Sequence, residues 1–336
     1  MREGFIPFNP HPKTMGLIHL ANEIIDQLAA MGYSLTLRQL YYQLVARDVI
    51  RNKQTEYKRL GKIINEARLA GLVDWDAIED RTRNLRGVTH YVDPTDVLGF
   101  AAGSFRLDKW ANQEKRVEVW VEKDALVQVL EKACTPLDVD YFSCRGYTSQ
   151  SEVYGASKRL LRYIEAGQTP VIIHLGDHDP SGIDMTRDII DRVNMFLAPY
   201  WGEEITVERI ALNMNQVRQY NPPPNPAKQT DSRYKQYKAK HGVHCWELDA
   251  LNPQVIDELI TKRVLAHRDD DKWAEMEKEE EAHREKLRAC TDRWDEVKAV
   301  LNFDPATYRI INRVTPENPI NLKPTSRKSK NKTNRK

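Results

Sequence analysis

Cysteine is scarce in this sequence, and the few cysteines are far apart. The chain of 336 residues has four, Cys134, Cys144, Cys245 and Cys290, and no two of them form a Cys-x-x-Cys pair. Zinc sites and disulfide frameworks need cysteines at short or repeated spacings. The pattern therefore excludes both, and it indicates the reduced thiols of a cytoplasmic protein.

Long apolar runs are also absent. No run approaches the roughly 20 residues that cross a bilayer, and the first residues, Met-Arg-Glu-Gly-Phe-Ile-Pro, lack the apolar segment of a signal peptide. Hydrophobic residues make up 40% of the chain and charged residues 30%, as is typical of globular proteins without a membrane segment. A chain of this length is long enough for two domains, each with its own core.

Acidic residues are missing from the last part of the chain. The segment 323–336 has seven lysines and arginines and no acid, although the whole chain has a net charge of only +2. The rest of the chain therefore has a net charge of −5. A basic segment that is also rich in Ser, Asn and Thr cannot form a core, and we expect it to be disordered. A non-specific nucleic-acid arm is the favoured interpretation, and a solubilising end is the alternative.

The most informative stretch begins with a short β-branched run, Val171–Leu175, which predicts a buried parallel strand. Asp177 and Asp179 follow at its carboxyl end, where open α/β sheets bind ligands. Two carboxylates two residues apart in an extended backbone can point the same way. Their oxygens are hard ligands, so the spacing is compatible with a Mg²⁺ site.

Three other interpretations of this stretch compete with a magnesium site. Asp179 followed by Pro180 makes a good N-cap and first helical residue, a role that does not exclude a metal. A calcium loop is discounted because a strand precedes it and Asp188 stands where such a loop has Glu. An ordinary solvated turn fits the local spacing as well as a metal site does.

The sequence before this stretch favours the metal site. Val117–Val121 predicts a strand that ends at Glu122, a helix follows from Asp124 to Ala133, and Val139–Cys144 predicts a second strand. A further helical pattern leads to the strand before Asp177. The order is thus β-α-β-α-β-α, which predicts an α/β fold with acids at the carboxyl ends of the first and third strands.

Three amphipathic helices are predicted near the N-terminus, at 15–30, from 37 onward and at 56–69. In the second helix Tyr41 lies on the apolar stripe, whereas Tyr42 lies four residues after Arg38 on the more polar face. An adjacent guanidinium favours a phenolate and can hold a phosphate. The alternative is a half-exposed tyrosine stacked on an arginine.

The third predicted helix has a basic face, and Arg81, Arg83 and Arg86 follow it. Three helices followed by a stretch with Gly and Val fit a winged helix, in which the third helix enters the major groove of DNA. From 93 to 113 the sequence has no clear period and contains Pro and Gly, so we expect irregular structure and a domain boundary there.

The predicted strand ends resemble those of the TOPRIM domain. Glu122 ends the first strand, Gly146 follows the second, and Asp177-x-Asp179-x-x-Gly182 follows the third. Among TOPRIM proteins, the chain most resembles the A subunit of type IIB topoisomerase (topoisomerase VI) and the related meiotic double-strand-break transesterase. In this family the three acids, here Glu122, Asp177 and Asp179, bind Mg²⁺.

Two further segments are similar to this family. The segment 36–42 resembles its Arg-x-x-Tyr/Phe-Tyr motif, which implies that Tyr42 is the nucleophile and that Arg38 holds the phosphate. The segment 246–251, Trp-Glu-Leu-Asp-Ala-Leu, resembles the end of the family's TOPRIM region. Glu247 and Asp249 are interpreted as structural or supporting groups there.

The resemblance implies a domain organisation. It comprises a winged-helix domain at 1–92, a linker at 93–115, a Rossmann-like TOPRIM domain at 116–265, a helical extension at 266–322 and the basic tail at 323–336. The segment 253–301 is predicted to be helical.

The function implied is Mg²⁺-dependent cleavage of double-stranded DNA through a 5′-phosphotyrosyl link. The protein would be a homodimer associated with DNA in the cytoplasm. Because the chain has no Gly-rich ATP-binding segment, strand passage would need a separate ATPase subunit. Two alternatives stay open, a hydrolytic TOPRIM nuclease without a covalent intermediate and a DNA-binding protein without catalysis.

Overall fold

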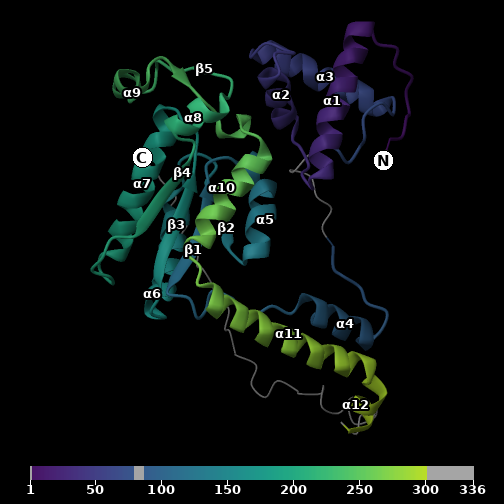
Figure 1. Ribbon diagram of the computed structural model, residues 1–336, viewed down its shortest axis with the longest axis vertical. Coiled ribbons are helices and arrows are strands. Elements are labelled where there is room, and N and C mark those ends of the chain that lie inside the picture. Colours follow the sequence, from purple (N-terminus) through teal and green to yellow (C-terminus); the bar gives the residue numbers. More distant parts are fainter. Residues whose placement is uncertain (1, 79–86, 301–336) are drawn as a thin grey trace, which may run out of the picture. The chain divides into compact units, whose positions relative to one another are not determined.

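The structure, a computed structural model, describes residues 2–78 and 87–300 (Figure 1). Contacts divide the chain into two compact units. Met1–Val88 and Leu107–Glu279 form the first unit, and Thr89–Arg106 forms the second with the chain from Glu280 onward. The predicted basic tail at 323–336 and the arginines Arg81, Arg83 and Arg86 lie outside the described residues.

A four-stranded parallel sheet is the centre of the first unit. Its strands are β1 (Lys115–Val121), β2 (Asp140–Ser143), β3 (Thr169–Leu175) and β4 (Thr206–Ala211), in the order β2-β1-β3-β4. Strands β1 and β3 are neighbours whose last residues, Val121 and Leu175, are paired. The prediction of an α/β chain with a parallel sheet is confirmed. Residues that follow β1 and β3 are consequently brought to the same edge of the sheet.

Helices cover both faces of the sheet (Figure 1). The alternation of side chains places Val119 and Ile173 in one core, which includes α5 (Val127–Cys134) and α10 (Pro253–Leu265), and Trp120 and Ile172 in another. The second core includes α6 (Gln150–Glu165) and α7 (Pro180–Leu197). Both faces are mainly apolar, as buried parallel strands require, although Glu118 of β1 and His174 of β3 are buried polar exceptions on the second face.

The N-terminal part of the first unit is helical. It consists of α1 (Pro12–Ala30), α2 (Leu37–Ala46) and α3 (Gln54–Leu69), which bury a common apolar core. The predicted capping box at the start of α2 is present, since Gln39 Oε1 accepts from the Thr36 N–H at 2.8 Å and Thr36 Oγ1 accepts from the Gln39 N–H at 3.3 Å. Each of these helices lies close to its predicted range.

A small lobe follows β4 in the first unit. After α8 (Met214–Tyr220) come β5 (Asn225–Pro226), α9 (Tyr234–His241) and β6 (His244–Cys245), and the two short strands pair antiparallel. The 3₁₀ turn η3 (Leu248–Ala250) then leads into α10. This turn contributes Ala250 to the core of the N-terminal helices.

The second unit contains a helix in a segment expected to be irregular. Helix α4 (Pro94–Ser104) begins with Pro94 and is capped by Asp93, whose side chain accepts from the N–H groups of Thr95 and Asp96. The Asp-Pro signal outweighed the glycines that suggested a loop. In the same unit the Phe105 ring lies 5.6 Å from that of His283.

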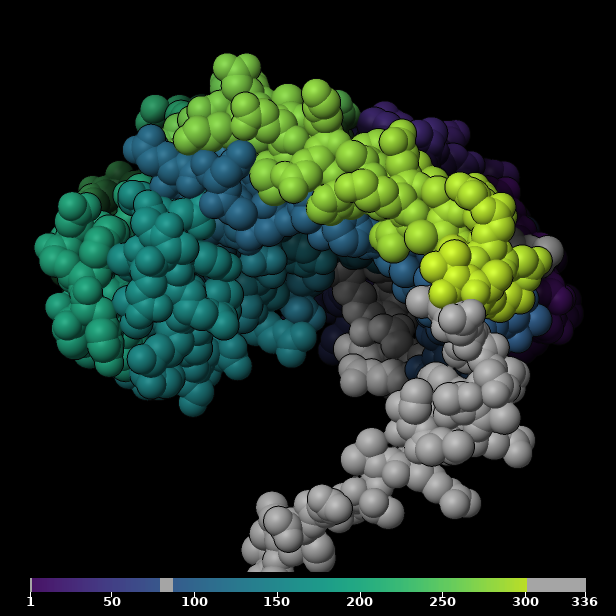
Figure 2. Space-filling model, turned by 90° about the horizontal axis from the view of Figure 1, so that it is seen from below, coloured from purple at the N-terminus to yellow at the C-terminus, as the bar shows by residue number. Residues whose placement is uncertain are grey.

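The predicted C-terminal helical segment is divided into α10, α11 (Asp270–Asp292) and α12 (Trp294–Val300). Most side chains of α11 are exposed, and the helix is visible along the surface in Figure 2. Within the described residues, no helix has both the length and the apolar character needed to cross a membrane.

Candidate functional site

The carboxylates predicted from the sequence lie at the carboxyl edge of β1 and β3. Glu122 follows β1 directly, and its Oε2 accepts from the backbone N–H of Asp177 at 2.8 Å. A side chain at Gly182 would place its Cβ 2.4 Å from the backbone oxygen of Asp177, so glycine is required for the close approach of α7. Burial raises the pKa of Glu122, and the Asp177 N–H opposes this shift.

Asp177 is buried and already has partners. Its Oδ1 accepts from the Leu248 N–H at 2.8 Å, and its Oδ2 lies 2.9 Å from Lys123 Nζ. Burial raises the pKa of Asp177 to about 8, against the opposing charge of Lys123. The carboxylate charges around Lys123 outweigh its burial and raise its pKa, so the ammonium group stays charged at neutral pH.

Asp179 is the N-cap of α7, as one of the sequence interpretations predicted. Its Oδ1 accepts from the Gly182 N–H at 2.6 Å and from Ser181 Oγ at 2.9 Å. Oxygen-rich carboxylates have the donor chemistry that Mg²⁺ prefers, and Asp179 is close enough to Glu122 to raise its pKa. Among residues 2–78 and 87–300, however, no group of three or more His, Cys, Asp and Glu side chains is arranged around one point.

Arg38 on α2 is held by the segment after β6. Its Nε lies 2.9 Å from Asp249 Oδ2, and its Nη2 donates to Glu247 Oε2. Lys123 Nζ reaches the same two acids, at 2.7 Å from Glu247 and 2.9 Å from Asp249. The four charges therefore connect α2 to the edge of the sheet and, through Lys123, to Asp177.

Glu247 carries a full negative charge in this network. Burial acts to raise its pKa, but the charges and hydrogen bonds of Lys123 and Arg38 outweigh burial and lower it to about 2. Asp249 has almost no exposed surface. The buried carboxylate of Asp249 and the partly buried one of Glu247 lie beside two cations, which satisfies the requirement that buried charges be paired.

The predicted environment of Tyr42 was wrong. The helical pattern placed it on the more polar face of α2, but the structure buries it to 4% exposure. This face of α2 is covered by the segment that contains η3, a tertiary contact that local periodicity cannot reveal. Arg38 Nη2 donates to Tyr42 Oη at 3.5 Å, so the expected neighbourhood of the two side chains is present.

Arg38 also lowers the pKa of the Tyr42 phenol less than expected. Burial raises the pKa of Tyr42, and the charge of Glu247 raises it further. Arg38 and a hydrogen bond from Asn225 lower it, but they do not outweigh burial. Tyr42 is therefore a neutral phenol at physiological pH rather than the phenolate that the arginine alone would favour.

Sequence reasoning missed Arg209 of β4. Its guanidinium donates to the backbone oxygens of Gly176 and Asp177 at 2.9 and 2.6 Å, and to that of Gly182 at 2.9 Å. Burial lowers the pKa of Arg209, and it outweighs the charges of Glu122 and the neighbouring aspartates, which act to raise the pKa. Arg209 therefore fixes the loop that carries the aspartates and places a positive charge beneath them.

Lys123 was missed as well, although signals for both residues exist in the sequence. An arginine within the strand Thr206–Ala211 has to satisfy a buried charge, and a lysine directly after a strand-terminal glutamate lies at the same edge as the acids. Neither signal identifies a partner, because the partners come from distant segments.

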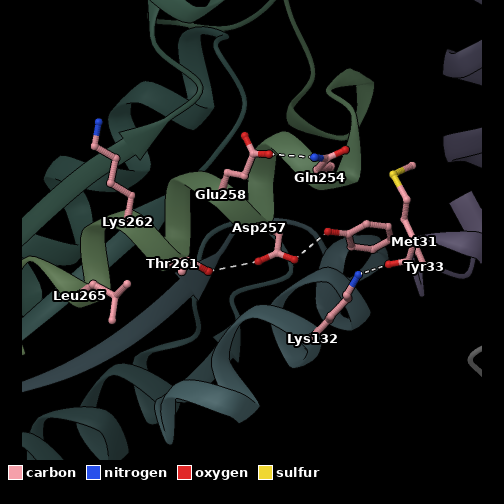
Figure 3. Close-up of a pocket in the computed structure, with 9 residues that line it drawn as sticks. All are labelled: Met31, Tyr33, Lys132, Gln254, Asp257, Glu258, Thr261, Lys262 and Leu265. Carbon is pink, nitrogen blue, oxygen red and sulfur yellow. Dashed lines mark hydrogen bonds between the residues drawn. The ribbon is translucent and has the colours of Figure 1, made fainter. Parts of the chain in front are cut away.

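A separate pocket of about 730 Å³ lies away from these residues, between α10, α5 and the turn after α1 (Figure 3). Tyr33 Oη donates to Asp257 Oδ2 at 2.6 Å, and Lys132 Nζ lies 3.3 Å from the centre of the Tyr33 ring. Burial and Asp257 raise the pKa of Tyr33. None of the residues predicted for catalysis or metal binding lines this pocket, whose polar contacts join the N-terminal helices to α10.

Comparisons with protein-family models, with curated proteins and with solved structures find no match for this chain.

The two adjacent tyrosines of α2 differ in their contacts, and this difference gives a testable prediction. Tyr41 Oη donates to Asn52 Oδ1 at 3.0 Å and to the Lys53 carbonyl oxygen at 3.2 Å, whereas Tyr42 Oη accepts from Arg38. Tyr41→Phe should lower the free energy of unfolding by about 1 kcal/mol, because it removes these hydrogen bonds. Urea denaturation measures this loss, and any DNA cleavage by the protein should persist.

Proposed function

We propose that this protein is a Mg²⁺-dependent DNA transesterase of the type IIB topoisomerase A-subunit kind, with a winged-helix part and a TOPRIM part. The observation that carries the proposal is the network from Arg38 through Glu247 and Asp249 to Lys123 and Asp177. It links the helix that bears Tyr42 to the strand-end acids. Such a reaction needs both a tyrosine nucleophile and acids that can hold a metal ion.

In the proposed reaction, Tyr42 Oη attacks a phosphorus atom of the DNA backbone. A bond forms between the phenolic oxygen and phosphorus, and the bond to the 3′ oxygen breaks. Because Tyr42 is a neutral phenol, its proton has to leave as the new bond forms, and the leaving 3′ oxygen gains a proton. Arg38 would hold the phosphate through its guanidinium in exchange for Glu247.

Glu122, Asp177 and Asp179 would hold Mg²⁺, which supplies positive charge beside the leaving oxygen. Arg209 keeps the backbone of the aspartate loop in place. Asp177 would bind the ion at the expense of its contact with Lys123. The proposal includes the homodimer, the separate ATPase subunit and the DNA-associated cytoplasmic location that the resemblance implies.

A hydrolytic nuclease is the second candidate, and one observation favours it. The side chain of Tyr42 is only 4% exposed, so a water molecule would reach a bound phosphate more easily than the phenol does. In that case the same acids would serve a water nucleophile. Tyr42 would then contribute only packing.

Denaturing electrophoresis after incubation with end-labelled duplex DNA and Mg²⁺ separates these functions. The transesterase gives labelled protein that survives denaturation. Free fragments without labelled protein would indicate the nuclease, and an intact duplex that is retained only in native gels would indicate binding without cleavage.

The metal part of the proposal predicts a loss of Mg²⁺ affinity in Asp179→Asn. Asparagine caps a helix as well as aspartate does, so the fold should be preserved while one anionic ligand is removed. We expect calorimetry to show at least about tenfold weaker Mg²⁺ binding. Asp191→Asn, on the exposed side of the same helix, is the matched control. Equal Mg²⁺ affinity in both variants would remove Asp179 from the metal site.

A further inference from the structure

The small lobe formed by residues 225–246, here called the α9 lobe, is a separate packing unit within the first unit. Ala227, Tyr237 and Cys245 are its buried core, and Ile183 of α7 packs against them. Tyr237 Oη also donates to the His244 carbonyl at 2.8 Å. The lobe is thus ordered by its own contacts, although it is short.

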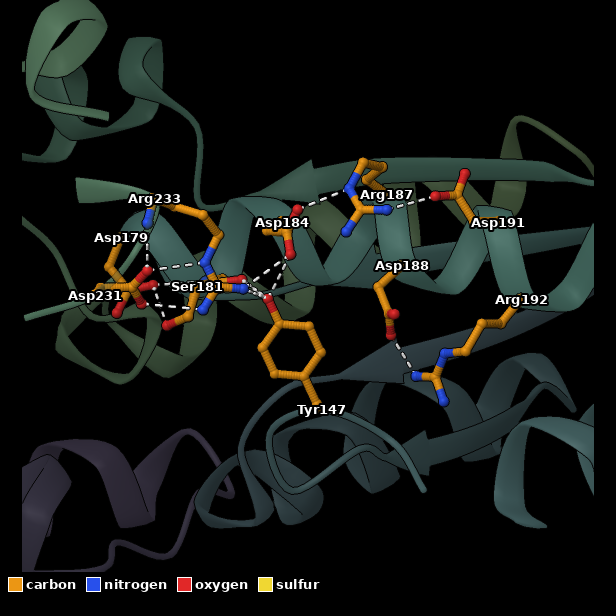
Figure 4. Close-up of polar contacts among 11 residues, drawn as sticks. Tyr147, Asp179, Ser181, Asp184, Arg187, Asp188, Asp191, Arg192, Asp231 and Arg233 are labelled. Carbon is orange, nitrogen blue, oxygen red and sulfur yellow. Dashed lines mark hydrogen bonds and ion pairs between the residues drawn. The ribbon is translucent and has the colours of Figure 1, made fainter. Parts of the chain in front are cut away.

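The α9 lobe is strongly basic. It has one acid, Asp231, against Arg233 and four lysines, which are Lys228, Lys235, Lys238 and Lys240. Arg233 is neutralised, since it lies 2.9 Å from Asp184 Oδ2 and 2.8 Å from Asp231 Oδ1 (Figure 4). Tyr147 Oη donates to the same Asp184 carboxylate at 2.6 Å. Arg233 consequently anchors the lobe to α7, and its charge is not available to a ligand.

The four lysines differ from Arg233 in their exposure and in their ion pairing. All are exposed, and within residues 2–78 and 87–300 none of them forms an ion pair with a carboxylate. On α3, by contrast, Arg59 lies 2.7 Å from Glu56 and Lys62 lies 3.7 Å from Glu66. A solvated helical face usually mixes the two signs of charge, as α3 does. The lysines of the lobe therefore form an uncompensated positive surface.

The α9 lobe is attached directly to the candidate site. Asn225 Nδ2 donates to Glu247 Oε1 at 3.3 Å and also hydrogen-bonds to Tyr42. Asn52, which follows α2, donates to Asn225 Oδ1 at 2.7 Å. The lobe consequently touches both the proposed nucleophile and the acid that holds Arg38.

The other end of the lobe is tied to the loop of the proposed metal ligands. The backbones of His178 and Trp246 exchange two hydrogen bonds, of 2.8 and 3.0 Å. His178 lies between Asp177 and Asp179 in the chain. The lysines are thus carried by an element whose two ends are fixed at the site.

We propose that the α9 lobe is a DNA-binding element whose lysines contact backbone phosphates beside the phosphate that is cleaved. This inference rests on the proposed function and adds a second DNA-binding surface beside the site of cleavage. Phosphates fit these exposed lysines because each ammonium group is a compact point charge with three donors. Lys235 and Lys238 are three residues apart on α9 and therefore lie on one face of the helix.

The test compares Lys235→Ala/Lys238→Ala with Lys278→Ala/Lys286→Ala, a control that removes two exposed lysines from α11. Fluorescence anisotropy with a 30-base-pair duplex measures affinity over a range of NaCl concentrations. We expect the lobe variant to bind roughly tenfold more weakly than wild type at low salt. Its slope of log K against log salt should be shallower by up to about 1.8, or 0.9 per lost contact. The control should match wild type.

Cleavage distinguishes failure of the inference from failure of the proposed function. At saturating DNA the lobe variant should form as much covalent adduct as wild type, because neither lysine contacts Tyr42 or the acids. If its affinity and slope equal those of the control while wild type binds and cleaves, the inference is overturned and the proposed function stands. If wild type does not bind duplex DNA, both are overturned. Loss of adduct at saturating DNA would also overturn a role limited to binding.

Discussion

Tyr42→Phe is expected to abolish covalent attachment to DNA. The substitution removes the single oxygen that would attack the phosphate and keeps the ring that packs in the core of the N-terminal helices. The hydrogen bond that Arg38 donates to this oxygen is long, at 3.5 Å, so affinity for duplex DNA should change by less than about twofold. Denaturing electrophoresis measures the adduct and anisotropy measures the affinity.

Tyr41→Phe is the matched control for this experiment. It removes a hydroxyl from the neighbouring ring, whose centre lies 5.2 Å from that of Tyr42, but whose bonds point to Asn52 and Lys53. An adduct that persists in Tyr42→Phe and disappears in Tyr41→Phe would show that the wrong tyrosine has been assigned. Free DNA fragments at unchanged yield in Tyr42→Phe would support hydrolysis instead.

Lys123→Met is expected to be the most destabilising substitution at the site. Lys123 contacts Asp177, Glu247 and Asp249, and its removal leaves buried carboxylates without their common cation. Breaking a buried ion pair by deleting one partner costs about 3–5 kcal/mol. We expect a loss of this size in the free energy of unfolding, as measured by urea denaturation without metal.

Two further variants test the cause of that loss. Lys123→Met/Asp249→Asn should be more stable than Lys123→Met, because one of the buried carboxylates that lost Lys123 is then absent. Lys286→Met, at an exposed position of α11, should change stability by less than about 0.5 kcal/mol. A Lys123→Met protein as stable as the Lys286→Met control would show that the acids do not depend on Lys123.

The sheet and most helices could be predicted because their signals are local. A β-branched run such as Val171–Leu175 reports a buried strand, and the capping box at Thr36 reports the start of α2. The positions of Glu122, Asp177 and Asp179 followed from the strand ends. Parallel neighbours β1 and β3 then brought these acids to one edge.

The contacts of the site could not be predicted because they join distant segments. Arg38 and Glu247 are far apart in the chain, and nothing local indicates that they pair. The same contact covers the face of α2 that was expected to be polar, which is why the environment of Tyr42 was wrong. The sequence predicted Asp177 as a metal ligand but could not reveal its partners Lys123 and Leu248, which are brought to it by folding.

Identification of the residue that becomes bonded to DNA is the most direct test of the central claim. Wild-type protein would be incubated with duplex DNA and Mg²⁺, denatured, digested with nuclease and protease, and analysed by mass spectrometry. The account predicts one modified peptide from α2, with a nucleotide 5′-phosphate on Tyr42. No modified peptide, or a nucleotide on Tyr41 or any other residue, would contradict it.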